Sequence, residues 1–168
     1  YQQMALMPAP PAWLNQVHGT DVIRLTATTA NGCNADAAVS TERGVVATVM
    51  TADCLPLLLC DAGGTQVAAI HAGWRGLCNG VIENTLAHFA KSDDVLVYLG
   101  PAISQTAFEV GAEVRAAFIA HAPEAAQAFI AGNDGKWLAD LYLLARQRLA
   151  QCGVQQIYGG NYCTYQQS

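Results

Sequence analysis

Three short polar segments interrupt an otherwise apolar chain, and each carries a side chain that can bind a metal ion. "NQVHG" contains His18, "TADC" ends at Cys54, and "AIHAGWRG" contains His71. Each of these residues lies where a hydrophobic segment meets a turn with Gly or Asp, so that side chains from separate strands can converge at one rim of a sheet. We therefore expect the three side chains to lie together.

A set of two histidines and one cysteine suits Zn²⁺, and it can also hold copper. Three protein ligands leave the fourth tetrahedral position open for water, as in catalytic rather than structural zinc sites. The same residue types also fit a second chemistry. In that reading a Cys54 thiolate attacks an acyl or amide group, a histidine acts as the base, and Asp53 or Asp36 orients it. The residues alone leave both readings open.

The residues that follow His71 indicate ligand binding. Arg75 precedes the next expected helix, where a guanidinium and free N–H groups suit an anion such as phosphate or carboxylate. Trp74 offers a surface on which a planar heterocycle can stack. Gly73 and Gly76 flank this pair, so that little side-chain bulk obstructs the loop. Each residue also has an ordinary structural explanation, Trp74 as part of the core and Arg75 as an ion-pair partner.

Composition favours one globular domain over residues 1–168. The chain is 52% hydrophobic and 12% charged, which is enough apolar surface for a large core. The net charge of −5 argues against a nucleic-acid or anionic-membrane surface. Arg75 and Trp74 suggest a small-molecule partner, and a monomer is compatible with the sequence.

The sequence predicts a cytoplasmic protein. No apolar run approaches the about 18 residues that a membrane span needs, and "YQQMALMPAPPAW" lacks the basic and apolar regions of a signal peptide. Six cysteines occur at irregular spacing without a C-x-x-C pair. We expect them to be free thiols in a reducing compartment.

Hydrophobic runs and turn signals predict an α/β (α+β) fold with a mixed sheet and flanking helices. Two runs around a Gly-Gly turn are typical of a hairpin, and Pro56 marks a strand start or an edge strand. The expected strands are 22–26, 35–40, 44–50, 55–61, 66–73, 95–101 and a short one near 156–160. The expected helices are 76–90, 111–121, 124–131 and 138–153, the last ending on Gly153.

Seven motifs in order resemble one family, from about Trp13 to Tyr165: "NQVHG", "ADAAVS", "TADCLPLLLCD", "AAIHAGWRG", "LGPAIS…AFEVG", "LADL…ARQRL" and "GGNYCTY". The chain is identified as a member of the YfiH-like laccase-domain family, described variously as polyphenol oxidases and as purine nucleoside phosphorylases. The resemblance implies an α/β sandwich with mixed sheets, grouped with cysteine-hydrolase-like toxin domains. It also implies that His18, Cys54 and His71 are metal ligands.

The resemblance implies a zinc-dependent enzyme acting on purine nucleosides. The reactions would be phosphorolysis of adenosine, inosine, guanosine or methylthioadenosine, with adenosine deamination as a second activity. Cys54, His71 and Asp53 are then the candidate catalytic residues, with Asp53 moving protons. Arg75 and Trp74 are the candidates for binding phosphate and base.

Three alternatives remain. A copper-dependent polyphenol oxidase fits poorly, because laccase chemistry needs many more histidines than the four present. A metal-free cysteine hydrolase could edit an amide in a peptidoglycan precursor. The third alternative is a binding module without turnover. It predicts that Cys54→Ala is tolerated.

Two features of the family do not occur in these residues. Members usually begin with an S-T-R-x-G-G-V-S-like motif and end with an F-F-S-Y-R-R-like motif, and the chain starts at Tyr1 rather than Met. The resemblance implies that these segments supply strands and arginines near the pocket. We expect the encoded protein to contain them.

Overall fold

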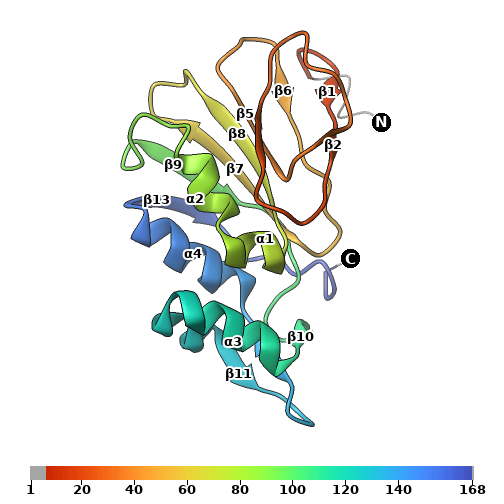
Figure 1. The fold of residues 1–168 in the computed structure, drawn as a ribbon, viewed down its shortest axis with the longest axis vertical. Helices are drawn as coiled ribbons and strands as arrows, with labels where there is room; N and C mark the ends of the chain where they lie inside the picture. Colours follow the sequence, from red (N-terminus) through yellow and green to blue (C-terminus); the bar gives the residue numbers. More distant parts are fainter. Residues whose placement is uncertain (1–6, 168) are drawn as a thin grey trace.

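The computed structural model describes residues 7–167, and a six-stranded mixed sheet forms its centre (Figure 1). The strand order is β13-β9-β7-β8-β5-β3. The strands are β3 (Val22–Arg24), β5 (Ala37–Ser40), β7 (Leu55–Asp61), β8 (Val67–Ala72), β9 (Val95–Leu99) and β13 (Gln156–Gly159). β3–β5 and β9–β13 pair in parallel, whereas β5–β8, β8–β7 and β7–β9 are antiparallel. The predicted mixed sheet is confirmed.

The apolar hairpin of β7 and β8 forms the middle of the sheet. Its pairing was predicted, but β7 lies between β8 and β9 and is not an edge strand. Pro56 is the second residue of β7, so the strand-start interpretation holds and the edge interpretation is wrong. Buried and exposed side chains alternate along this strand: Leu57 and Leu59 are buried, while Leu58 between them is 52% exposed.

Helices cover one face of the sheet (Figure 1). α1 (Trp74–Asn79), α2 (Val81–Leu86) and α4 (Leu141–Gln151) share with this face one large core that includes Leu57, Leu77 and Leu149. The predicted continuous helix over 76–90 is wrong. The observed helical segment starts earlier, at Trp74, and is interrupted at Gly80. The φ of Gly80 is 104°, a left-handed conformation that glycine adopts without strain.

The opposite face carries a thinner layer on one half only. β1 (Pro11–Ala12), β2 (Leu14–Asn15), β4 (Cys33–Asn34) and β6 (Val46–Ala47) are two-residue strands around a second core cluster with Leu14, Leu25 and Ala38. The strand expected over 44–50 is therefore mostly loop. The other half of this face exposes Leu58 and Tyr98.

A small antiparallel sheet forms the remaining part of the fold, next to α3 (Ala112–His121), in the order β10 (Glu109–Val110), β12 (Trp137–Ala139), β11 (Phe129–Ala131). The helix expected over 124–131 is a 3₁₀ segment, η2 (Pro123–Ala128), which leads into β11. α4 begins after Asp140 rather than at 138, because the Asp140 carboxylate accepts a hydrogen bond of 2.9 Å from the Leu143 amide and caps the helix. Its end is as predicted, with Gly153 at φ 83°.

None of the described helices combines the length and hydropathy that crossing a bilayer requires. All six cysteines are free thiols in the structure, as the sequence predicted.

Candidate metal centre

His71 is fixed at the end of a central strand. It is the fifth residue of β8 and only 3% of its surface is exposed. Its backbone amide donates to the Asp36 carbonyl at 2.7 Å, and its Nδ1 lies 2.8 Å from the Asp36 carboxylate oxygen Oδ1. Because Nδ1 is engaged by the carboxylate, Nε2 is the nitrogen left to bind a ligand.

Asp36 is a fully buried carboxylate at this site. It accepts hydrogen bonds from three consecutive backbone amides, those of Val17, His18 and Gly19, at 3.2, 2.9 and 2.6 Å. Burial by itself raises the pKa of Asp36, but the hydrogen bonds from His71 and the amides outweigh it and hold the pKa below its usual value. The buried charge is therefore stabilised by four hydrogen-bond donors.

His18 adopts a backbone conformation that is unusual for its type. Its φ is 58°, in the left-handed region that costs a non-glycine residue free energy. The Asp36 hydrogen bonds hold this conformation. As a result the His18 and His71 rings meet edge to face, with centroids 4.7 Å apart and planes at 80°.

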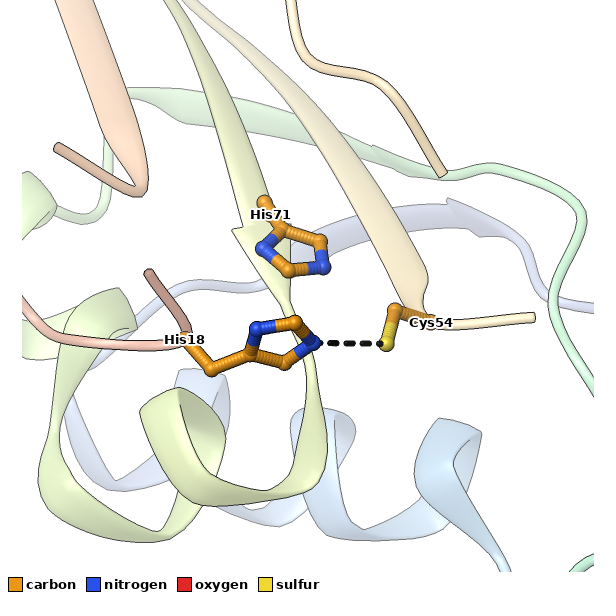
Figure 2. A group of neighbouring side chains, drawn as sticks. All are labelled: His18, Cys54 and His71. Carbon is orange, nitrogen blue, oxygen red and sulfur yellow. Dashed lines mark hydrogen bonds between the residues drawn. The ribbon is translucent and has the colours of Figure 1, made fainter. Parts of the chain in front are cut away.

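Cys54 completes the cluster from the loop immediately before β7. Its Sγ lies 3.9 Å from His18 Nε2, and one ligand atom from each of the three residues lies within 4.8 Å of the others. Figure 2 shows the three side chains turned toward one another. Thus His18, Cys54 and His71, from three distant segments, lie together as the sequence predicted.

The donor set fits a zinc ion. Zn–N and Zn–S bonds of about 2.0–2.3 Å in a tetrahedron place the ligand atoms about 3.3–3.6 Å apart, so a small inward movement of the side chains from the observed separations suffices. Borderline-soft nitrogen and sulfur ligands suit zinc, and also copper. Within residues 7–167 this is the only group of three or more such side chains.

The Cys54 thiol is held in its neutral form by its surroundings. Burial raises its pKa, and the nearby negative charges of Asp53 and Asp36 raise it further. With a raised pKa, the Cys54 thiol is not expected to ionise by itself at neutral pH. A bound cation would assist its deprotonation.

Asp53 is exposed and is connected to the C-terminal segment. Its Oδ1 accepts a hydrogen bond of 2.7 Å from Thr164 Oγ1, and its carbonyl accepts one of 2.9 Å from the Ile103 amide. The carboxylate is thus beside the cluster in sequence but engaged with another loop. Its role in proton transfer stays a prediction.

Trp74 and Arg75 form the first residues of α1. Trp74 is half-buried against the main core, and the exposed Arg75 guanidinium lies 4.6 Å from the Trp74 ring centroid. Arg75 is within the helix, so the expectation that it precedes the helix is wrong. The helix is also only six residues long, so the anion-binding prediction depends on the guanidinium itself.

Gly73 and Gly76, on either side of this pair, allow close packing between segments of the site. A Cβ at Gly73 would lie 2.9 Å from His18 Cδ2 and 3.1 Å from Cys54 Sγ. A Cβ at Gly76 would lie 2.6 Å from the Gly19 carbonyl oxygen. These glycines therefore let the His18 loop and Cys54 approach β8 and α1, a packing role that the sequence alone does not indicate.

Two features escaped the sequence reasoning. Asp36 was considered only as an orienter of a nucleophile pair, although a lone acid in the apolar "ADAAVS" segment signals a paired buried charge. The other is a cavity of about 420 Å³ lined by Ser104, Tyr142 and Cys163, among others. No local pattern in the sequence pairs Ser104 with Cys163.

The fold and the cluster define an α/β domain with a candidate His₂Cys metal centre. The whole chain, residues 1–168, matches the family model described as multi-copper polyphenol oxidoreductase laccase, and the chain belongs to this family. It is 58% identical over 160 residues to the purine nucleoside phosphorylase YfiH of Shigella flexneri and 56% identical to that of Escherichia coli K12. Each alignment covers 95% of this chain and 65% of the relative, so the chain spans slightly less than two thirds of these curated relatives.

Two solved structures have the same fold. The Neisseria meningitidis protein NMB0706 superimposes with a TM-score of 0.90 at 50% identity, over 97% of this chain and 67% of that one. YlmD from Geobacillus stearothermophilus gives a TM-score of 0.84 at 26% identity, also over 97% and 67%. The predicted family and fold class are confirmed.

Proposed function

We propose that this chain carries the metal centre of a purine nucleoside enzyme that cleaves the glycosidic bond with phosphate. The observation that carries the proposal is the convergence of His18, Cys54 and His71 on one point. The names of these relatives supply the substrate class. The proposed substrates are adenosine, inosine, guanosine and methylthioadenosine, and adenosine deamination is a second activity of the same site.

The proposed resident metal is zinc, held by the two imidazoles and the Cys54 thiolate. When bound, zinc supplies a Lewis acid that lowers the pKa of a coordinated water and polarises a substrate atom. Three protein ligands leave one tetrahedral position for that purpose. Copper would fit the same donors, so metal analysis is part of the test.

The other polar residues have proposed roles in the two reactions. In phosphorolysis a phosphate oxygen bonds to C1′ of the ribose, the C1′–N9 bond breaks, and the proton of hydrogen phosphate ends on the purine. Arg75 would bind the phosphate and Asp53 would relay the proton. Trp74 would stack on the base. In deamination water adds at C6 and ammonia leaves, and Asp53 would carry the proton from the water to the departing amine.

Four observations bear on two of the alternatives. The description of the family model favours a copper polyphenol oxidase, but laccase chemistry requires a further copper cluster, and residues 7–167 contain a single group of three or more candidate ligands. The 3.9 Å separation of Cys54 Sγ and His18 Nε2 favours a metal-free cysteine hydrolase. The raised pKa of Cys54 opposes it.

The test uses the full-length encoded protein after zinc loading. Inosine with phosphate should give hypoxanthine and ribose 1-phosphate, and omission of phosphate should stop this reaction. Adenosine without phosphate should give inosine. Cys54→Ser should abolish both reactions, whereas Cys60→Ser, a matched change within β7, should leave them intact. Absence of any product above a blank would refute the proposal, and nucleoside turnover that persists after complete metal removal would refute the role of the metal in it.

A further inference from the structure

One carboxylate connects the segments that carry the two histidines. Both oxygens of the fully buried Asp36 are occupied, Oδ1 by His71 Nδ1 and the His18 amide, and Oδ2 by the amides of Val17 and Gly19. We infer that Asp36 is the positioning residue of the metal centre, which sets the tautomer of His71 and the backbone conformation of His18 together. This inference rests on the proposed function for its metal.

The tautomer of His71 follows from which atoms in its contact with Asp36 can donate a hydrogen bond and which can only accept one. An ionised carboxylate only accepts hydrogen bonds, so the 2.8 Å contact with Oδ1 requires a proton on His71 Nδ1. In the neutral ring the lone pair then lies on Nε2, the atom left to face the cluster. Such a carboxylate–histidine pair also makes the imidazole a stronger ligand.

The conformation of His18 depends on the same carboxylate. Three successive amides, those of residues 17–19, converge on Asp36, and the middle one belongs to the residue at φ 58°. Consecutive N–H groups in such a turn form a concave site for an anion, and here a side chain of the protein fills it. Because the His18 amide and the His71 ring share Oδ1, displacement of this atom would move both ligands.

Asp36→Asn distinguishes this role from simple packing, because the two side chains have the same shape. All four partners of Asp36 donate hydrogen bonds. If the amide nitrogen took the place of Oδ1, it would donate to His71 Nδ1 and move the ring proton to Nε2, the ligand atom. If it took the place of Oδ2, it would oppose the Gly19 amide, 2.6 Å away in the wild type. Either orientation damages the centre.

The first experiment needs no variant. Long-range ¹H–¹⁵N spectra of metal-free, ¹⁵N-histidine-labelled full-length protein at pH 8 report which ring nitrogen of each histidine is protonated. We expect His71 to be protonated at Nδ1. A wild-type His71 protonated at Nε2 would overturn the inference, whether or not any variant folds.

The second experiment compares Asp36→Asn with Asp61→Asn. Asp61 is a matched control, because its carboxylate also accepts backbone amides, from Thr65 at 2.7 Å and Gln66 at 2.8 Å, at the far end of β7. Competition with a chromophoric chelator should show zinc affinity reduced about 10–100-fold in Asp36→Asn and unchanged in Asp61→Asn. Unchanged affinity in Asp36→Asn would overturn the inference.

These readouts separate the inference from the proposed function. Neither the tautomer nor the zinc affinity involves a nucleoside. A protein that binds zinc as expected but turns over no nucleoside would refute the proposed function and leave the role of Asp36 in place. Conversely, turnover with an unchanged Asp36→Asn zinc affinity would refute only the positioning role.

Discussion

Cys54 and Cys163 lie on two neighbouring loops, joined by the hydrogen bond from Thr164 to Asp53, yet their surroundings act on the thiols in opposite directions. Burial and the charges of Asp53 and Asp36 raise the pKa of Cys54. At Cys163, hydrogen bonds led by the Ser104 hydroxyl, which donates at 3.0 Å, lower the pKa to about 7. Cys163 is buried, with 6% of its surface exposed, but it lines the open cavity beside Ser104.

The difference separates two ways of activating a sulfur atom. Cys163 is activated by neutral donors and needs no partner ion. Cys54 has two imidazoles within reach and carboxylates nearby, which disfavour the thiolate on its own and would stabilise a cation bound there. The proposed metal centre therefore implies that the two cysteines respond differently to substitution, alkylation and pH.

The largest expected effect is loss of the metal from Cys54→Ser. Removal of a ligand atom should reduce zinc affinity by more than the about 10–100-fold typical of changes to residues behind the ligands. Cys163→Ser should bind zinc like the wild type. Chelator competition and elemental analysis measure both, and equal zinc content in the two variants would remove the distinction between the cysteines.

Alkylation should show the next largest contrast. At pH 7 a thiol with a pKa of about 7 is about half ionised, against about 1% for one at the ordinary value of 9. In metal-free protein the rate of iodoacetamide labelling at Cys163 should level off about one pH unit above 7, while that at Cys54 should still rise above pH 9. Peptide mapping by mass spectrometry measures each rate. A shared midpoint would contradict the comparison.

Gly73→Ala should lower the zinc affinity of the centre that contains Cys54 and leave the surroundings of Cys163 unchanged. The added methyl group would lie 2.9 Å from His18 Cδ2 and 3.1 Å from Cys54 Sγ, so both ligands must shift. We expect zinc affinity to fall about tenfold, in the range of changes next to the ligands. Gly63→Ala, where the nearest atom is 3.4 Å away, is the control. Equal affinity in the two variants would show that the site tolerates the displacement.

The smallest expected effect concerns Cys163. Ser104→Ala removes its main donor and leaves the Ser104 amide at 3.4 Å, so the pKa of Cys163 should rise toward 9. Labelling at pH 7 should slow several-fold, because the smaller thiolate fraction is partly offset by higher nucleophilicity. Ser92→Ala should have no effect. An unchanged pH profile in Ser104→Ala would mean that other contacts lower the pKa.

The sequence predicted the long elements of the fold better than the short ones. The β7–β8 hairpin and the end of α4 were correct, because long apolar runs and a C-terminal glycine are strong local signals. The two-residue strands such as β2 and β4 have no periodicity, and they form only because distant segments meet. The break at Gly80 and the cap at Asp140 were present in the sequence, but the apolar spacing around them masked both.

The candidate ligand residues were predictable from the sequence, but the contacts that position them were not. His18, Cys54 and His71 interrupt apolar segments, and that local pattern was enough to group them. The contact between Asp36 and the His18 amide joins residues 18 positions apart, and the room left by Gly73 depends on three segments packing at once. Such features depend on tertiary packing, which no local pattern in the sequence records.

The most direct test of the central claim is anomalous scattering at the zinc edge from crystals of the zinc-loaded full-length protein. The account predicts one strong peak about 2.0–2.3 Å from His71 Nε2, a His18 ring nitrogen and Cys54 Sγ, with Asp36 still bound to His71 Nδ1. A fully loaded crystal with no peak between these three side chains, or with its peak elsewhere, would contradict it.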